Sequence, residues 1–146
     1  VLSDLTEELA ALAIANDIQL RLDRPASPPA IVAGNEEHLY QLMLNIVSNA
    51  LQHTPPGGQV SIQMKRLERE VVVTIADTGA GIPLADLHRI FDRFYRVDKN
   101  RSRHSGGSGL GLSIALAIAQ AHGGSIRVKS QVGKGSTFAI RLPILA

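Results

Sequence analysis

The segment that decides the fold is LMLNIVSNAL, residues 42–51 of a chain of 146 residues. Its apolar residues recur at the spacing of one face of an α-helix, which predicts a helix from Asn35 to about Gln52. The turn sequence PPGG at residues 55–58 ends this helix. Its buried stripe is predicted to consist of Leu39, Leu42, Met43, Ile46 and Ala50.

Two asparagines, Asn45 and Asn49, stand beside this apolar stripe. Asparagine is a poor helix former because its side chain competes for nearby backbone groups, and burying its amide without partners costs about 1–3 kcal/mol. The spacing of four places both amides on one face of the helix, with His38 and Gln41 one turn earlier and His53 one turn later. An isolated pair of this kind most often bonds to the backbone or to a loop, so a role in binding needs support from other segments.

The patterns on both sides of this helix predict a mixed sheet. Before it, we expect a helix over residues 3–15, a strand over 17–23, a turn-rich break over 25–29 and a short strand over 30–33. After it, we expect strands 59–65 and 70–76, a helix near 84–89, a polar stretch at 98–107, a helix over about 110–122, and strands 125–130 and 136–143. Hairpins are mixed with helices here and do not alternate strictly with them. The prediction is therefore an α/β fold with helices covering one face of a mixed, mostly antiparallel sheet.

Composition excludes several classes of protein. The net charge is only +2 and the basic residues form no long stripe, so nucleic-acid binding is not predicted. The absence of cysteine excludes disulfides, a thiol nucleophile and a cysteine zinc site. No apolar run approaches the roughly 20 residues that span a bilayer, and the first residues do not resemble a signal peptide. Since the chain does not begin with Met, we expect it to be part of a longer protein.

Asp77 ends a β-branched strand and is followed at once by Gly79 and Gly81. Glycine allows a sharp turn and lets another molecule approach the backbone closely. A carboxylate held at such a turn can accept hydrogen bonds from a planar amine. A plain strand-to-helix turn capped by Asp77 explains this motif equally well when it is taken alone.

A second glycine-rich segment, GGSGLGLS at residues 106–113, runs directly into a predicted helix. Exposed N–H groups at a glycine-rich helix N-terminus suit an anion, above all phosphate. The spacing matches neither the P-loop nor the dinucleotide-binding fingerprint. Between the two glycine segments, residues 90–96 (IFDRFYR) hold most of the aromatic side chains, which indicates a hydrophobic anchor for the polar stretch.

Taken together and in this order, these four segments resemble the N, G1, F and G2 boxes of the histidine kinase catalytic domain. That domain belongs to a superfamily shared with the gyrase, mismatch-repair and heat-shock-chaperone ATPases. The resemblance runs from about residue 17 to the C-terminus and includes HGG at 122–124 and GKGSTF at 133–138. It implies a two-layer α/β sandwich of the Bergerat type, with one catalytic ATP-binding domain over residues 1–146. Residues 1–16 would be a connecting helix from an absent dimerisation and phosphoacceptor domain.

The resemblance also implies a site for ATP and Mg²⁺. Asn49 would coordinate the Mg²⁺ that bridges the phosphates, with Asn45 assisting. Asp77 would accept a hydrogen bond from the adenine amino group, and His53 would stack on adenine. The backbone at Gly79 and Gly81 would lie close to the nucleotide, and Thr137 would help to form the adenine pocket. The phosphates would be bound by the second glycine segment, at Gly107, Gly109, Leu110 and Gly111. Arg96 would reach the γ-phosphate, with Lys99, Arg101 and Arg103 as alternatives for that contact.

The residue at position 45 bears on the reaction. Related ATPases carry a glutamate there as general base, whereas this chain has Asn45, and an amide cannot take a proton at neutral pH. Phosphoryl transfer to imidazole needs positioning and charge neutralisation more than a strong base, so the resemblance implies a protein-histidine kinase.

None of the five histidines lies in an H-E-x-x-[ST]-P context, so the phosphorylated histidine is expected on a separate domain. The implied partners are therefore the dimerisation domain of the parent kinase and, indirectly, a response regulator. The resemblance implies a cytoplasmic, monomeric domain without direct membrane contact, and a membrane-anchored parent is compatible with it.

Other functions remain open at this stage. The sequence DTGA at residues 77–80 matches the active-site motif of retroviral-type aspartic proteases, which are mostly β and pair two copies of the aspartate across a dimer. That interpretation leaves the long helix and both glycine segments unexplained. Closer alternatives are a serine kinase or an ATPase of the same superfamily, and a degenerate module that only binds.

Overall fold

The computed structural model of the chain describes residues 9–11, 13–15, 17–23, 36–92 and 111–144. In these ranges the strands are β1 (Gln19–Asp23), β2 (Gln59–Arg66), β3 (Glu70–Asp77), β4 (Ser125–Gln131) and β5 (Gly135–Pro143). The helices are α2 (Glu36–Gln52), α3 (Leu84–Leu87) and α5 (Gly111–Ala121), and residues 9–11 and 13–15 are also helical. The elements predicted within these ranges are confirmed to within about two residues at most ends. The strand predicted at 30–33 and the polar stretch at 98–107 lie outside the described residues.

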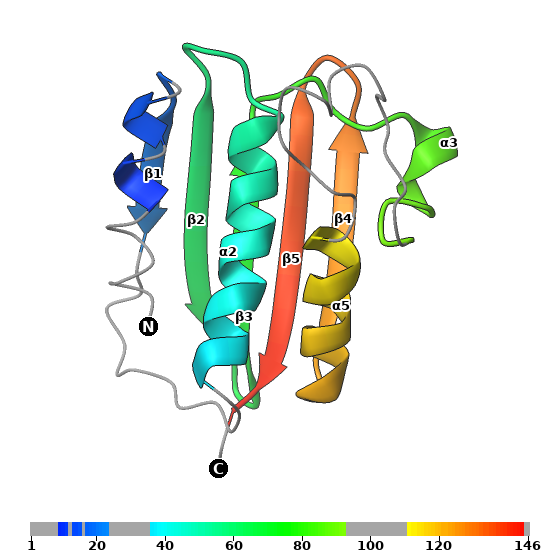
Figure 1. Ribbon diagram of the computed structural model, residues 1–146. Coiled ribbons are helices and arrows are strands. Elements are labelled where there is room, and N and C mark those ends of the chain that lie inside the picture. The colour runs from blue at the N-terminus through cyan, green and yellow to red at the C-terminus, as the bar shows by residue number, and fades with distance from the viewer. Residues whose placement is uncertain (1–8, 12, 16, 24–35, 93–110, 145–146) are drawn as a thin grey trace.

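The five strands form one mixed sheet in the order β1-β2-β3-β5-β4. β1 and β2 are parallel, and the other three neighbouring pairs are antiparallel. Parallel strands need a long connection, which α2 provides between β1 and β2. Figure 1 shows α2 and α5 side by side on the same face of the sheet, and they contact each other. The predicted two-layer arrangement is confirmed.

The core lies between this face of the sheet and the two helices. In β3 and β5 buried residues alternate with half-buried ones, as expected for strands with one covered face. Phe138 and Ile140 of β5 are fully buried beside Val73 and Ile75 of β3. Four residues of the predicted α2 stripe are buried and Leu39 packs against them half-buried, while Val47 and Leu51 extend the stripe beyond the prediction. None of the helices in the described ranges has the length and apolar character needed to cross a lipid bilayer.

Candidate functional site

Asp77 lies at the end of β3, on the face that the helices cover, and only 8% of its surface is exposed. Its Oδ1 atom accepts hydrogen bonds from the backbone N–H groups of Gly79 (2.9 Å) and Ser136 (3.2 Å). Its Oδ2 atom accepts none from the residues that the structure describes. That oxygen is not sealed from solvent, because no fully buried side-chain oxygen in the described ranges lacks a partner. One carboxylate oxygen is thus fixed by the backbone, and the other is left to accept a donor from outside.

The environment of Asp77 also alters its proton affinity. Burial raises the pKa of this carboxyl above its ordinary value of 3.8, while the two backbone N–H groups and the nearby His53 act in the opposite direction. Burial is the largest of these effects, so the ionised carboxylate is destabilised relative to one in water. A buried, partly compensated carboxylate with one open oxygen is a typical feature of a binding site.

Strand register determines which β5 side chain stands beside this carboxylate. Asp77 pairs directly with Ser136, and Ala76 pairs with Thr137. Paired residues share a face, so Thr137 points to the opposite side of the sheet from Asp77. The prediction that Thr137 helps to form the pocket beside the Asp77 carboxylate is therefore wrong. The buried Ser136 lies there. The alternation of Ser136, Phe138 and Ile140 on the core face of β5 was the signal that could have identified it.

Gly79 and Gly81 are required by contacts inside the protein. A Cβ atom at Gly79 would lie 2.3 Å from the carbonyl oxygen of His53, at the end of α2. Gly81 has a φ of +79°, and a Cβ there would lie 2.2 Å from the carbonyl oxygen of Gln131. The segment after Asp77 can therefore pack against α2 and the β4–β5 turn only with glycine at these positions. The positive φ of Gly81 confirms the predicted turn, and the close approach of a ligand to the backbone stays a prediction.

Asn45 links the two helices. Its Nδ2 group donates to the carbonyl oxygen of Gly111, the first residue of α5, at 3.1 Å, and its Oδ1 accepts from Gln41 at 2.6 Å. The predicted alignment of Gln41 with Asn45 on one face is confirmed by this hydrogen bond. Asn45 thus holds the N-terminal end of α5 against the middle of α2.

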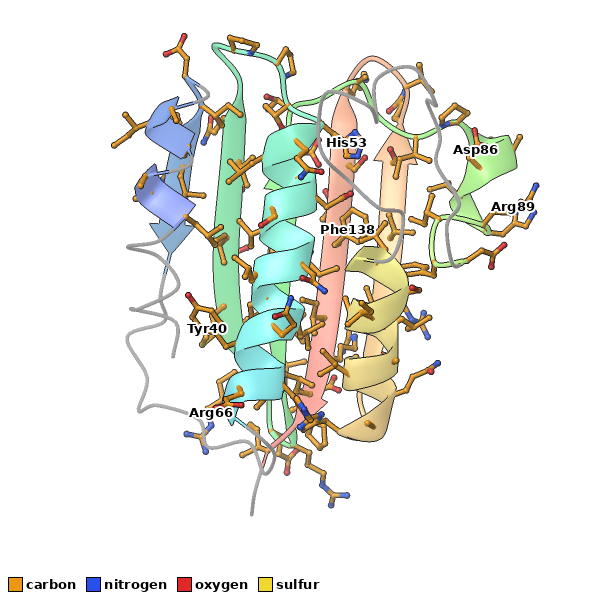
Figure 2. All side chains as sticks on the ribbon, in the orientation of Figure 1. Tyr40, His53, Arg66, Asp86, Arg89 and Phe138 are labelled. Atoms are coloured by element: carbon orange, nitrogen blue, oxygen red, sulfur yellow. The ribbon has the colours of Figure 1, made fainter. Side chains whose placement is uncertain are left out.

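Asn49 and His53 continue the same face of α2 toward Asp77. Asn49 is half-buried, and its amide makes no hydrogen bond to another residue of the described ranges. His53 follows one turn later with an exposed side chain at the end of the helix (Figure 2). Its N–H donates to the carbonyl oxygen of Asn49 at 3.2 Å. The structure therefore brings Asn45, Asn49, His53 and Asp77 into one strip that runs from the start of α5 to the end of β3.

Several predicted site residues lie outside the described ranges. The described ranges include Gly111 but not the rest of the second glycine segment, so Gly107, Gly109 and Leu110 lie outside them. The same holds for the four basic candidates, which are Arg96, Lys99, Arg101 and Arg103.

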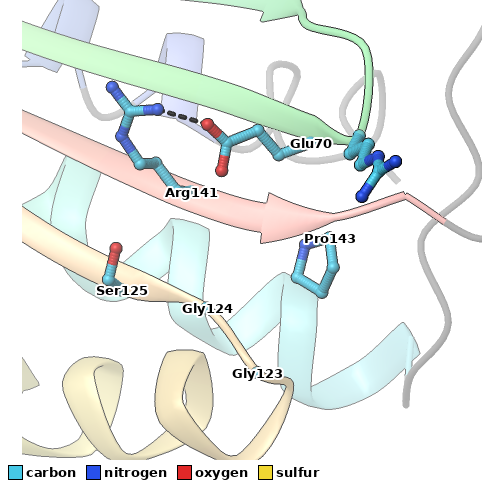
Figure 3. Close-up of a pocket in the computed structure, with 7 residues that line it drawn as sticks. Glu70, Gly123, Gly124, Ser125, Arg141 and Pro143 are labelled. Carbon is cyan, nitrogen blue, oxygen red and sulfur yellow. Dashed lines mark hydrogen bonds and ion pairs between the residues drawn. The ribbon is translucent and has the colours of Figure 1, made fainter.

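A surface hollow lies at the opposite end of the sheet (Figure 3). It is lined in part by Glu70, Gly123, Arg141 and Pro143, and an ion pair joins Arg141 to Glu70. Glu70 begins β3 and Asp77 ends it, so the hollow is about 20 Å from the carboxylate at roughly 3.3 Å per residue. The hollow is therefore separate from the strip of polar residues along α2.

Comparison with known proteins shows the family to which the chain is related. Residues 34–146 match the family model described as histidine kinase-, DNA gyrase B- and HSP90-like ATPase. The sensor histidine kinase RppB of Synechocystis sp. is 47% identical over 146 residues, which is 100% of this chain and 32% of RppB. The chain spans about a third or less of the length of the curated relatives it matches.

Solved structures agree with the sequence comparison. The mycobacterial sensor histidine kinase MprB superposes with a TM-score of 0.81 and 29% identity, covering 98% of this chain and 94% of that chain. Full-length ShkA in complex with AMPPNP superposes with a TM-score of 0.84 and 28% identity, covering 99% of this chain and 29% of that chain. The mixed sheet and helices also leave no basis for the aspartic protease alternative. The chain belongs to the family of histidine kinase-, DNA gyrase B- and HSP90-like ATPases.

Proposed function

We propose that this chain binds Mg-ATP between α2, the start of α5 and the end of β3, and donates the γ-phosphate to a histidine on a separate dimerisation domain of its parent kinase. The observation that carries the proposal is Asp77, whose Oδ1 is fixed by two backbone N–H groups while Oδ2 is open. An acceptor of this kind suits the amino group of adenine. The curated relatives are sensor histidine kinases, and the similar ShkA was solved with AMPPNP, which supports ATP as the nucleotide.

The α2 residues fit a magnesium ion shared with phosphates. Mg²⁺ prefers oxygen ligands and is usually held by one or two protein groups together with substrate phosphates and water. The amide of Asn49 has no other partner in the described ranges, so its oxygen is available, whereas Asn45 already bonds to Gln41 and Gly111. We therefore assign Asn49 as the principal ligand and give Asn45 the role of fixing α5. Mg²⁺ bound there would neutralise charge on the phosphates.

The start of α5 lies next to these amides through the bond from Asn45 to Gly111. Free N–H groups at a helix N-terminus attract phosphate, and α5 has no acidic residue in its first turn to compete with it. Asn45 cannot act as a general base, so the residues described here position phosphates and do not activate water. A phosphoryl group held in this way is available to an imidazole from another domain.

Two experiments test the proposed function. Calorimetry with the chain and Mg-ATP should give a Kd between about 1 μM and 1 mM, or about 4–8 kcal/mol. Incubation with a separately supplied dimerisation and phosphoacceptor domain should transfer radiolabelled γ-phosphate to its histidine. Absence of binding at millimolar ATP would refute the nucleotide site. Binding without transfer to any histidine domain would favour an ATPase or serine kinase of the same family.

Replacing Asn49 by Ala should chiefly remove the magnesium dependence of ATP binding. In the parent chain Mg²⁺ should tighten binding by about tenfold or more, since a charge-assisted ligand interaction is worth roughly 1.5–3 kcal/mol. In Asn49→Ala the Kd values measured with Mg²⁺ and with EDTA should differ by less than about twofold. Gln63→Ala, which truncates an exposed amide on β2, is the matched control and should keep the full dependence. A full magnesium effect in Asn49→Ala would exclude this residue as the ligand.

The isolated chain should hydrolyse ATP slowly. The residues that position the phosphates include no general base in the described ranges, and Asn45 stands where related ATPases have glutamate. We expect turnover far below the typical enzyme value of about 10 per second. A phosphate-release assay in saturating Mg-ATP measures this directly. Turnover near the typical value would contradict the role given to Asn45 and favour the ATPase alternative.

A further inference from the structure

The hydroxyl group of Ser130, at the end of β4, joins three segments that surround Asp77. It accepts a hydrogen bond from the N–H of Ile82 at 2.6 Å, just after the glycine segment. It donates to the carbonyl oxygen of Gly135 at 3.0 Å, where β5 begins. Its third contact is with the hydroxyl oxygen of Ser136 at 2.8 Å. Ser130 therefore fixes the parts of the fold that position the carboxylate.

The direction of the contact between the two serines follows from counting protons. A serine hydroxyl has one proton and two lone pairs. The N–H of Ile82 can only donate, and the carbonyl of Gly135 can only accept. If Ser130 gives its proton to Gly135, then Ser136 must donate to Ser130, and all three contacts contain a proton. The reverse direction would leave the Ser130 oxygen 3.0 Å from a carbonyl oxygen with no proton between them.

We propose that Ser130 is a positioning residue that holds the Ser136 hydroxyl as a hydrogen-bond acceptor beside Asp77 and thereby selects 6-amino over 6-oxo purine nucleotides. Ser136 and Asp77 are directly paired in the sheet and share its covered face. With its proton engaged by Ser130, Ser136 presents lone pairs, as Asp77 does with Oδ2. These two side chains thus both offer acceptors.

This inference rests on the proposed function and deepens it. A 6-amino purine brings N–H donors to the two acceptors, whereas a 6-oxo purine brings a carbonyl oxygen that both acceptors repel. Without the Ser130 hydroxyl, the Ser136 O–H can rotate and donate to a 6-oxo group. The preference for ATP over inosine triphosphate should then fall by about tenfold, the scale of one buried hydrogen bond. Inosine triphosphate is the appropriate probe because it lacks the additional 2-amino group of GTP.

The experiment compares calorimetric Kd values for Mg-ATP and Mg-inosine triphosphate across matched variants. Ser130→Ala should lower the ratio of the inosine triphosphate Kd to the ATP Kd by about tenfold. Ser130→Thr, which keeps a hydroxyl, should restore most of this ratio. Ser125→Ala changes a serine at the other end of β4 and should leave the ratio unchanged. In a Ser136→Ala background, which itself lowers the ratio, adding Ser130→Ala should have no further effect on selectivity.

The outcomes separate this inference from the site on which it rests. If the parent chain prefers ATP and Ser130→Ala weakens both nucleotides equally, Ser130 has only a structural role and the inference is overturned. If Ser130→Ala does not fold, the Ser136→Ala variant decides, because an unchanged ratio there overturns the inference as well. A parent chain that binds neither nucleotide would overturn the proposed function and this inference with it.

Discussion

Replacing Asp77 by Asn is expected to lower the affinity for Mg-ATP by about 10- to 100-fold. The Oδ1 atom of asparagine can still accept from the N–H groups of Gly79 and Ser136, so the side chain should keep its position. The open Oδ2 becomes an NH₂ group that faces the adenine amino group, and two donors then oppose each other. A hydrogen bond to a charged acceptor is worth roughly 1.5–3 kcal/mol, which gives this range. Calorimetry with ATP measures the change.

The same substitution should have the opposite effect on stability in the absence of ligand. Because burial raises the pKa of Asp77, the folded chain holds this proton more tightly than the unfolded chain does. The contribution of Asp77 to the free energy of unfolding is therefore fully present below pH 3.8 and is lost as pH rises through the raised pKa. The asparagine side chain of the Asp77→Asn variant cannot ionise, so the variant should not lose this stability as pH rises. At pH 7 it should unfold at the same denaturant concentration as the parent chain or at a higher one.

Asp92→Asn is the matched control for both effects. The Asp92 carboxylate is 59% exposed and forms a surface ion pair with Arg89, so neither ATP affinity nor stability should change appreciably. Equal ATP affinity in Asp77→Asn and the parent chain would show that adenine does not bind at this carboxylate. Lower stability of Asp77→Asn at pH 7 would show that the backbone hydrogen bonds need the charge.

Gly79→Ala is expected to destabilise the chain by about 1–3 kcal/mol and to abolish measurable ATP binding. The added methyl group would lie 2.3 Å from the carbonyl oxygen of His53 and 3.0 Å from Oδ1 of Asp77, so the backbone of one segment must move. We expect the glycine segment to be the one that shifts, and its movement breaks the hydrogen bond from the Gly79 N–H that fixes the carboxylate. Denaturant unfolding measures the stability change, and calorimetry with millimolar Mg-ATP measures the loss of binding.

Gly111→Ala controls for the general effect of a glycine-to-alanine change on stability. A Cβ at Gly111 meets no atom of the described residues within 4 Å, and alanine favours helix, so stability should be unchanged or rise by up to about 1 kcal/mol. Parent-like stability and ATP binding in Gly79→Ala would mean that the segment after Asp77 can shift without cost, which contradicts the packing described above.

The elements of this chain could be predicted from the sequence because their patterns are local. The period of α2, the alternation in β3 and β5 and the glycine turns each depend on residues within a few positions of one another. The spacing of Asn45, Asn49 and His53 on α2 placed them on one face for the same reason. Alternation in β5 also placed Ser136 on the core side with Phe138, although the prediction chose Thr137.

The surroundings of Asp77 were decided only by the tertiary structure. The sequence determined that a carboxylate ends a strand and precedes a glycine turn, and it placed the two amides on one helix. The pairing of Asp77 with Ser136, 59 residues away, depends on strand register, which is set by packing across the whole sheet. The close packing of Gly79 against the His53 carbonyl and the three hydrogen bonds of Ser130 also depend on packing across the whole sheet. Such contacts join segments that are distant in the chain, so no local pattern encodes them, and they determine which oxygen of Asp77 is left for a ligand.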